Sequence, residues 1–471
     1  MVAFMWTIIS FLLICLTIET TYCSRFAPAP SPNPESVSTA GAPGSHSETH
    51  HPSRAAPASA PAHDPTSEAS APSAAIPESM RRIFDVTQYG AVSDGQSDSQ
   101  LAFLSAWNDV CDWDGEPTLL IPKGTFFVSP ITFQGPCYNN YPLKIEIAGT
   151  LKAPSDVHEF EEPSWIVIKK LNNFIFTGNF TGILDGQGEE SWARPPCRGK
   201  KRCKEYPHSI RFRKVSNATI SNISLLNSKC FHISFLDSSN VLMSGINITA
   251  PGNSRNTDGI HLSRSSDIKI TSSRIGVGDD CVSIGAGNTN IAIFSVYCGP
   301  GHGISVGSLG KYDNEKDVAG ISVKNCTINS TTNGLRIKTW PGPQAIKVNN
   351  ISFEDIKMIN VSNPIIIDQK YCPGHSCDSD ISSVELNNIR FFNIKGTSHT
   401  SSAVNIFCSP KVPCKNLHLR DINLTYANGS TFAESTCFNT LGANFEMENP
   451  IPCVNSDQSY LAPWNMENNL H

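Results

Sequence analysis

Hydrophobic and polar positions alternate in short runs over most of the chain, and these runs recur at a nearly constant spacing. Each run begins with small polar residues and continues into alternating β-branched residues, as in "SNATISNISLLNS" from Ser216, "SSNVLMSGINITAPG" from Ser238, "SSDIKITSSRIGVGDD" from Ser265 and "NTNIAIFSVYCGPGHG" from Asn288. Steps of 23, 27 and 23 residues separate the matching positions Asn217, Asn240, Asp267 and Asn290. A period in the twenties, with short strands joined by Asn, Ser and Gly turns, is typical of a solenoid.

The composition of the repeats indicates which solenoid this is. Later copies, "GISVKNCTINSTTNG" and "AIKVNNISFEDIKMIN", continue the series with longer loops. Leucine-rich repeats have a similar period, but they need many Leu residues at fixed offsets, whereas these repeats favour Ile and Val. The pattern therefore predicts an all-β chain folded as a right-handed parallel β-helix.

One segment near the start of the repeats has the spacing of a helix instead. In "SDSQLAFLSAWNDVC", Asp98 or Ser99 can cap the helix, and Leu101, Leu104 and Trp107 follow at helical spacing. We expect a short amphipathic helix that covers the N-terminal end of the β-stack.

The chain before the repeats divides into two parts of different composition. Residues 1–23 are an apolar run that ends in small and polar residues, which is typical of a secretory signal peptide; an uncleaved membrane anchor is the alternative. Residues 24–81 are rich in Pro, Ala and Ser and almost free of large apolar residues, so they are expected to be disordered. The remaining residues, 82–471, form the predicted β-helix domain. The expected location is therefore outside the cell.

Composition and charge limit the possible partners. The chain has 471 residues, a formal net charge of −6 and only 17% charged residues, with 32 Gly and 32 Pro. This balance argues against general electrostatic capture of nucleic acid or of an anionic membrane. An anionic substrate would have to be held by a local cluster of Arg and Lys.

The 16 cysteines fit the oxidising export route, since several lie close together in sequence. Local disulfides are favoured over a zinc site because the spacings form no paired CxxC units. The candidate pairs are Cys197 with Cys203, Cys281 with Cys298, Cys372 with Cys377, Cys408 with Cys414, and Cys437 with Cys453. Ten Asn-x-Ser/Thr sequons, including Asn179, Asn247, Asn350 and Asn428, also fit secretion, and we expect only some to be glycosylated.

Ionisable residues recur with the period of the solenoid. Asp258 in "NTDGIH", Asp280 in "GDDC" and His302 in "GHG" are spaced 22 residues apart and then 22 again. Residues one coil apart in a parallel stack lie about 4.8 Å apart along the axis. The three side chains are therefore expected to form a column, with Asp279 beside it.

Two cations follow in the next coil. Arg336 and Lys338 of "RIKTW" are two positions apart, so they point to the same face of a strand. Taken singly, these motifs have ordinary structural interpretations: Asn-Thr-Asp and Gly-His-Gly as turns, an Asp pair as a turn or cap, and the cations as an exposed strand face. Independent turns need not place their ionisable residues in one column. Their co-registration therefore favours catalysis.

The same segments carry a family resemblance. "NTDGIH", "GVGDDCVSIGAG", "CGPGHGISVGSLG" and "GLRIKTW" resemble the four motifs of the polygalacturonases, the pectin-hydrolysing family of right-handed β-helix glycosidases. "FDVTQYGAVSDGQSDSQLAFLSAW" and "GILDGQGEESW" also match, and the resemblance spans about Ile83 to Cys453. It is strongest to plant members, which implies a secreted cell-wall enzyme acting on polygalacturonate or pectin as a monomer.

Position by position, the resemblance implies a role for each site residue. Asp279 would be the general acid, and Asp258 and Asp280 would activate the hydrolytic water. His302 would tune the acid. The galacturonate ring and its carboxylate would be held by Asn256, Arg336, Lys338 and Tyr371. The resemblance implies no cofactor and no metal.

The chemistry of crowded carboxylates agrees with these roles. Inverting glycoside hydrolysis needs one protonated carboxyl group and one carboxylate that activates water. Repulsion within "GDD" is expected to keep an acid protonated while another group stays ionised. Three alternatives remain: a related rhamnogalacturonan- or xylogalacturonan-type hydrolase, a calcium-dependent β-helix lyase, and a non-catalytic polyuronide-binding wall protein.

Overall fold

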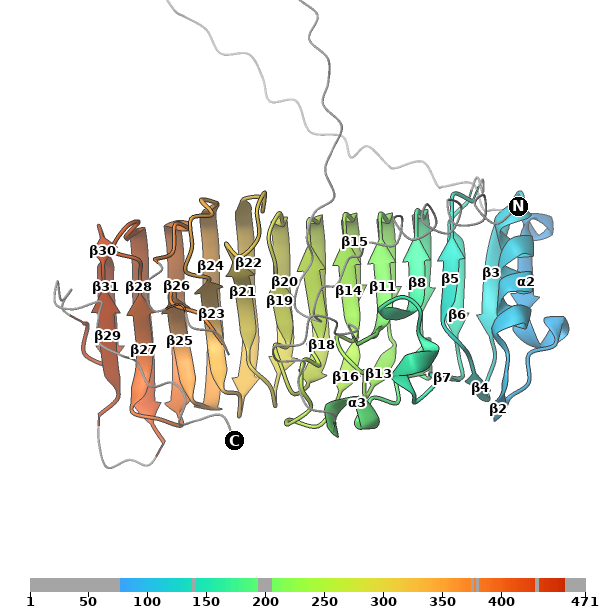
Figure 1. Ribbon diagram of the computed structural model, residues 1–471, viewed down its shortest axis with the longest axis horizontal. Coiled ribbons are helices and arrows are strands. Elements are labelled where there is room, and N and C mark those ends of the chain that lie inside the picture. The colour runs from blue at the N-terminus through green and yellow to red at the C-terminus, as the bar shows by residue number, and fades with distance from the viewer. Residues whose placement is uncertain are drawn as a thin grey trace, which may run out of the picture.

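The computed structural model describes residues 77–137, 141–193, 206–373, 377, 381–427 and 432–453. These residues wind into successive coils, so that strands stack side by side along one long axis (Figure 1). The expected signal peptide, almost all of the Pro/Ala/Ser-rich segment, and residues 454–471 lie outside the described residues. No helix within the described part is long and apolar enough to cross a membrane.

Within the described residues, the strands form two sheets in which every pair of neighbours is parallel. The smaller sheet has 11 strands. In spatial order these are β5 (Ile131–Gln134), β8 (Ser164–Lys169), β11 (His208–Arg213), β14 (Ile233–Leu236), β17 (Ile260–Ser263), β19 (Val282–Ile284), β21 (Ile304–Leu309), β23 (Asn333–Thr339), β25 (Asn363–Asp368), β27 (Ser402–Phe407) and β29 (Glu434–Phe438).

The larger sheet has 20 described strands and wraps the other sides of each coil. They are β1 (Arg81–Asp85), β2 (Asp94–Asp98), β3 (Glu116–Ile121), β4 (Thr125–Phe127), β6 (Leu143–Ile147), β7 (Thr150–Lys152), β9 (Asn172–Thr177), β10 (Ile183–Asp185), β12 (Ser216–Ser221), β13 (Ser224–Leu226), β15 (Ser239–Ser244), β16 (Asn247–Thr249), β18 (Ser266–Gly276), β20 (Thr289–Cys298), β22 (Val318–Asn329), β24 (Lys347–Val361), β26 (Glu385–Ser398), β28 (Cys414–Tyr426), β30 (Thr440–Leu441) and β31 (Asn444–Asn449). The prediction of a right-handed parallel β-helix is confirmed.

The polar positions that reveal the repeat form a ladder at one turn of each coil. Asn217, Asn240, Asp267 and Asn290 all have φ between 51° and 56°. This left-handed conformation favours Asn and Asp among residues that carry a side chain. The Asn240 amide donates to Asn217 Oδ1 at 2.6 Å, and the Asn290 amide donates to Asp267 Oδ1 at 2.5 Å. Successive coils therefore make the same turn and link their side chains across it.

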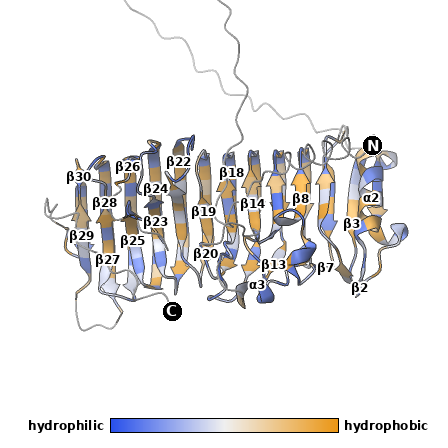
Figure 2. Cartoon of the chain, viewed as in Figure 1, coloured by the Kyte–Doolittle hydropathy of each residue, from blue (hydrophilic) through white to orange (hydrophobic). Residues whose placement is uncertain are grey.

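The apolar positions between these turns fill the interior. Ile260, Val282, Ile304 and Leu335 occupy matching positions on neighbouring strands of the smaller sheet, and all are fully buried. Figure 2 shows hydrophobic residues along the strands and many hydrophilic residues at the turns. Burial of one apolar column after another stabilises each coil against its neighbours and sets the register of the outward-facing side chains.

Helix α2 (Gln100–Asp112) covers the N-terminal end of the stack, as predicted (Figure 1). Its first residue follows Ser99, and Asp98 Oδ1 accepts a hydrogen bond from the Gln100 main-chain nitrogen at 3.0 Å. The expected apolar face is wrong in part, because Leu101 is 75% exposed. The helix has apolar residues at adjacent positions, so a second face fits the same spacing. The buried face consists of Ala102, Phe103, Ala106, Trp107 and Val110.

The other helical segments are short. They are α3 (Glu189–Ala193) and the 3₁₀ turns η1 (Glu78–Met80), η2 (Val86–Tyr89) and η3 (Val157–Glu159).

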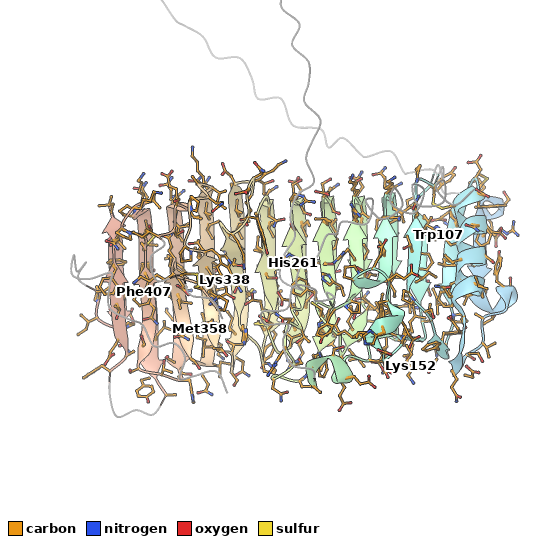
Figure 3. The ribbon with its side chains drawn as sticks, in the orientation of Figure 1. Trp107, Lys152, His261, Lys338, Met358 and Phe407 are labelled. Atoms are coloured by element: carbon orange, nitrogen blue, oxygen red, sulfur yellow. A yellow bond between two sulfur atoms is a disulfide. The ribbon has the colours of Figure 1, made fainter. Side chains whose placement is uncertain are left out.

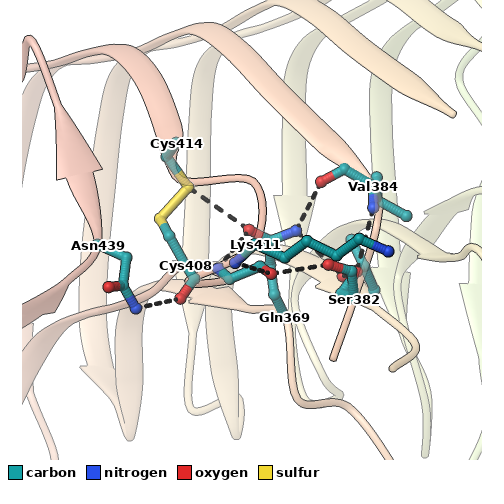
Figure 4. The surroundings of a disulfide bond; sticks show 9 residues. Gln369, Ser382, Val384, Cys408, Lys411, Cys414 and Asn439 are labelled. Carbon is teal, nitrogen blue, oxygen red and sulfur yellow. Dashed lines mark hydrogen bonds between the residues drawn. A yellow bond between two sulfur atoms is a disulfide. The ribbon is translucent and has the colours of Figure 1, made fainter. Parts of the chain in front are cut away.

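Four expected disulfides are present, namely Cys281–Cys298, Cys372–Cys377, Cys408–Cys414 and Cys437–Cys453. A further disulfide, Cys111–Cys137, was not predicted from the sequence. The expected pair Cys197–Cys203 lies outside the described residues. Figure 4 shows Cys408–Cys414 beside Gln369, which accepts a hydrogen bond from the Ser409 main-chain nitrogen at 3.0 Å. These bridges join residues within a coil or between adjoining segments.

Candidate active site

The predicted column lies in the middle of the smaller sheet, just before the start of strands β17, β19 and β21. Ile260 pairs with Val282, and Val282 pairs with Ile304. Asp258, Asp280 and His302 each stand two residues before these positions, so their backbones are in register. Main-chain hydrogen bonds continue through this segment, with the Gly259 nitrogen donating to Asp280 O at 2.9 Å. The spacing of 22 residues therefore does bring the three residues together.

Asp279 and His302 form a close pair. Asp279 Oδ1 lies 3.0 Å from His302 Nδ1 and also accepts the Asp280 main-chain N–H at 2.8 Å. Burial opposes ionisation of Asp279, but the His302 charge and hydrogen bond outweigh it and hold the pKa of Asp279 well below its usual range. Burial likewise opposes the charged form of His302, yet Asp279 raises the pKa of His302. The favoured state is a carboxylate beside an imidazolium.

Asp280 is paired with a cation from another coil. Its Oδ2 lies 2.6 Å from Lys338 Nζ, and its Oδ1 accepts a hydrogen bond from Ser305 at 2.7 Å. Asp280 and Lys338 are 1% and 7% exposed. Burial opposes the charge on Lys338, but Asp280 outweighs it, and the pKa of Lys338 is raised. The two residues form a buried ion pair.

Gly307 provides the space in which Lys338 lies. The two residues are paired across strands β21 and β23. A Cβ atom on Gly307 would fall 2.2 Å from the Lys338 carbonyl oxygen and 2.9 Å from its Cγ. The φ of Gly307 is +123°, which residues with a side chain rarely adopt. Glycine at this position of "SVGSLG" therefore permits the Lys338–Asp280 contact.

Asp258 differs from the neighbouring Asp279 in having a raised pKa. It is 5% exposed, and burial, followed by repulsion from Asp279 and Asp280, raises its pKa well above the usual value. A hydrogen bond from Ser283 to Asp258 Oδ2 at 2.6 Å acts in the opposite direction. This differs from the expectation that repulsion keeps an acid protonated within "GDD". His302 and Lys338 neutralise that pair, so the effect of repulsion appears on Asp258 instead.

The predicted substrate-binding residues gather beside this cluster. The ring of Tyr371 lies 4.9 Å from Arg336 Cζ and 5.3 Å from Lys338 Nζ, measured to its centroid. Arg336 Nη2 is 3.9 Å from Asp368 Oδ2, too far for a hydrogen bond. Asn256, on the other side, directs its Nδ2 toward Asp279 Oδ2 at 3.5 Å. All eight residues singled out in the sequence thus lie in one region; Figure 3 labels Lys338 within it.

Several polar residues of the site were not predicted from the sequence. Ser283 and Ser305 hold Asp258 and Asp280, and they are themselves 22 residues apart, so the period of the acids could have revealed them. Asp368 carries a buried carboxyl group whose pKa is raised by burial. It pairs in register with Lys338 after a coil of 30 residues. That spacing falls outside the regular period.

A metal ion has a geometric candidate here as well. Ligand atoms of Asp279, Asp280 and His302 lie within 4.8 Å of one another. In this arrangement the charges of the two carboxylates are already balanced by His302 and Lys338, at 3.0 and 2.6 Å. An added cation would have to compete with both, so we assign none.

Comparisons with known proteins match most of the chain. The model of the family described as Glycosyl hydrolases family 28 matches residues 111–443. A polygalacturonase from Nicotiana tabacum is 43% identical over 383 residues, which cover 81% of this chain and 94% of that protein. An exopolygalacturonase from Platanus acerifolia is 42% identical over 363 residues, covering 77% of this chain and 95% of the relative.

Solved structures of the same architecture are also similar. An exopolygalacturonase from Thermotoga maritima aligns with a TM-score of 0.61 at 20% identity, covering 74% of this chain and 89% of that one. A polygalacturonase from Erwinia carotovora aligns with a TM-score of 0.59 at 24% identity, covering 80% of this chain and 99% of that one. These likenesses support the fold.

Proposed function

Because the chain belongs to family 28 of the glycosyl hydrolases, we propose that it hydrolyses the α-1,4-galacturonosyl bonds of polygalacturonate with inversion at the anomeric carbon. The observation that carries the proposal is the meeting of three carboxyl groups with two cations on one strip of the sheet. The carboxyl groups belong to Asp258, Asp279 and Asp280, and the cations to Arg336 and Lys338. The first set can cleave a glycosidic bond, and the second can recognise a uronic acid.

The general acid in this proposal is the Asp279–His302 pair. The pair holds one proton that can lie on either side of the 3.0 Å contact between Nδ1 and Oδ1. At rest the proton is on His302. As the bond to the leaving sugar breaks and its oxygen gains charge, His302 passes its Nδ1 proton to Asp279, which delivers a proton to that oxygen. Asp279 is then a carboxylate beside a neutral imidazole, and His302 regains a proton from the solvent before the next turnover. Loss of the His302 proton at high pH would therefore stop acid catalysis.

The water is activated by the other two carboxyl groups. Asp280 is bound by Lys338 at 2.6 Å and by Ser305 at 2.7 Å, and Asp258 must lose its proton to accept one from water. The water adds to the anomeric carbon while the leaving sugar departs from the opposite face, which produces inversion. Because the pKa of Asp258 is raised, this requirement defines the acidic limb of the activity profile.

Arg336 is the cation best placed to receive the substrate carboxylate. Its distance of 3.9 Å from Asp368 leaves the guanidinium without a tight ion pair there, whereas Lys338 is already bound to Asp280. Tyr371 lies against both cations and can pack on the sugar ring. Asn256 can bind a sugar hydroxyl near Asp279. Secretion to the cell wall and a monomeric state remain predictions.

The test compares substrates that differ only in charge. Initial rates on de-esterified polygalacturonate and on heavily methyl-esterified pectin are measured for the wild type and for Arg336→Gln. The wild type should prefer the charged polymer, and the variant should lose at least about tenfold in kcat/KM on it, since 1.4 kcal/mol corresponds to a factor of ten. Indifference of the wild type to esterification contradicts the substrate assignment. An unsaturated, UV-absorbing product would instead identify a lyase.

A further inference from the structure

Two hydrogen bonds in series connect His261 to Asp258. His261 on β17 is the register partner of Ser283 on β19, and its Nδ1 lies 2.8 Å from Ser283 Oγ. The Ser283 hydroxyl in turn donates to Asp258 Oδ2 at 2.6 Å. A hydroxyl that donates its proton to a carboxylate can accept one from an imidazole N–H. The order of donors is therefore His261 to Ser283 to Asp258.

The surroundings of His261 keep the imidazole in the neutral form that this series of hydrogen bonds requires. Burial, assisted by Arg211 and Lys338, lowers the pKa of His261 to about 3. The ring is thus neutral at ordinary pH and has one N–H, which the contact with Ser283 places on Nδ1. The ring also packs against Phe231 at 4.7 Å between centroids, which fixes its orientation. His261, labelled in Figure 3, comes from the strand that follows Asp258.

We propose that His261 and Ser283 are positioning residues for the water-activating carboxylate, with His261 orienting the Ser283 hydroxyl so that it holds Asp258 Oδ2 and leaves Oδ1 for the water. The inference rests on the proposed function, because it adds residues that orient the water-activating Asp258 assigned there. Neither side chain touches the reacting atoms in this scheme. Their effect passes through the charge state and orientation of Asp258.

The expected direction of the effect follows from the groups around Asp258. Asp279 and Asp280 face it from the next coil and raise its pKa, while Lys338 on β23 and the Ser283 hydrogen bond lower it. His232, from the preceding coil, contacts its main-chain oxygen at 3.1 Å, and burial lowers the pKa of His232 to about 4, so it adds no charge. Removing the Ser283 bond should therefore raise the pKa of Asp258 further. The acidic limb of the kcat profile should then move to higher pH.

Separate variants test the two hydrogen bonds of the series. Ser283→Ala should move the acidic limb of the kcat profile on polygalacturonate upward by about one pH unit, which corresponds to about 1.4 kcal/mol, whereas Ser283→Thr, which keeps a hydroxyl, should not. His261→Phe keeps an aromatic ring against Phe231 but loses the donor, and should move the limb in the same direction by less. His261→Asn keeps a donor near the position of Nδ1 and should restore it. The double variant Ser283→Ala/His261→Phe should shift no further than Ser283→Ala alone.

A second histidine–serine pair in the same sheet supplies a matched control. His208 Nδ1 lies 2.8 Å from Ser234 Oγ, and the His208 ring also packs against Phe231, at 4.6 Å between centroids. Among the described residues, the Ser234 hydroxyl makes no hydrogen bond to a carboxylate. Ser234→Ala should therefore leave the acidic limb unchanged.

The outcomes distinguish the failure of each idea. An unmoved acidic limb in Ser283→Ala that retains the near-UV circular dichroism of the wild type overturns the proposal. An equal shift in Ser234→Ala does so too, because the shift would then not require a hydrogen bond to Asp258. Additive shifts in the double variant would show that His261 does not act through Ser283. A wild type that does not hydrolyse polygalacturonate contradicts the proposed function instead.

Discussion

Replacing Lys338 by Met removes the cation nearest to Asp280 while keeping much of the length of the side chain. The two charged atoms are 2.6 Å apart, and the residues are 7% and 1% exposed. At an effective dielectric constant of about 20, unit charges at this distance attract by roughly 6 kcal/mol. Desolvation offsets part of that attraction, but removing one partner leaves the other charge buried and destabilises a protein by about 3–5 kcal/mol. We expect a loss of stability of that size in Lys338→Met.

The assay follows unfolding in urea at neutral pH for Lys338→Met, Asp280→Asn and the double variant. The double variant has no buried charge left without a partner at this pair, so it should recover most of the stability lost in Lys338→Met. Lys338→Met and the double variant should each lose at least about tenfold in kcat/KM on polygalacturonate, because 1.4 kcal/mol corresponds to a factor of ten. Stability and activity should therefore separate between the single and the double variant.

A matched control comes from the neighbouring cation. Arg336→Met removes a side chain that is similarly buried but lies 3.9 Å from its nearest carboxylate, so its effect on stability should be smaller. The expected loss of stability is contradicted if Lys338→Met unfolds at the wild-type urea concentration. Its assigned cause is contradicted if the double variant is no more stable than Lys338→Met, since the lost stability would then not come from an uncompensated charge on Asp280.

Three further outcomes are expected from the site and one from the surface. Asp279→Asn keeps its shape but cannot deliver a proton, so initial rates should fall by about 10²–10⁴-fold with folding intact by circular dichroism; a near wild-type rate would remove Asp279 from this role. Early-time NMR should show the β-anomer released first from the α-linked polymer, and an initial α-anomer would contradict inversion. Activity should fall as pH rises through the raised pKa of His302 and as pH falls through that of Asp258; a His302→Gln profile that keeps the alkaline limb would contradict the assignment of that limb. In a secreted preparation, peptide mass mapping should find glycan on Asn247, which has no side-chain hydrogen bond to the described residues, but not on Asn217, whose amide nitrogen donates to Asn172 at 2.6 Å; the reverse occupancy would show that the ladder does not protect Asn217.

Much of the fold could be predicted because one physical requirement repeats along the chain. Every coil must turn at the same place, and the positive φ there selects Asn or Asp, which makes the period visible at Asn217 and Asn240. Helix α2 has no such repetition. Its apolar residues satisfy two faces at once, and only contact with the end of the stack shows that Phe103 is buried while Leu101 is exposed.

The site was predictable to the extent that the coils around it have equal length. Equal lengths place Asp258 and Asp280 in register, and the same spacing connects Ser283 to Ser305. After Gly307 the coils grow longer, and Lys338 pairs with Asp368 at an interval of 30 residues. Spacing alone therefore could not identify Asp368, whose relevance depends on its burial beside Arg336.

The location of the proton depends on contacts that adjacency in sequence does not encode. Repulsion between Asp279 and Asp280 suggests a shared proton, but each of these carboxylates has a cationic neighbour, at 3.0 and 2.6 Å. The side-chain hydrogen bond to Asp258 among the described residues comes from the neutral Ser283 hydroxyl, and this bond and the charge of Lys338 do not offset desolvation and repulsion. The acid of the proposed mechanism consequently keeps its proton on His302 until the leaving oxygen gains charge. Because an imidazole holds this proton, acid catalysis should be lost as the pH rises through the pKa of His302, and not already near the ordinary pKa of a carboxyl group.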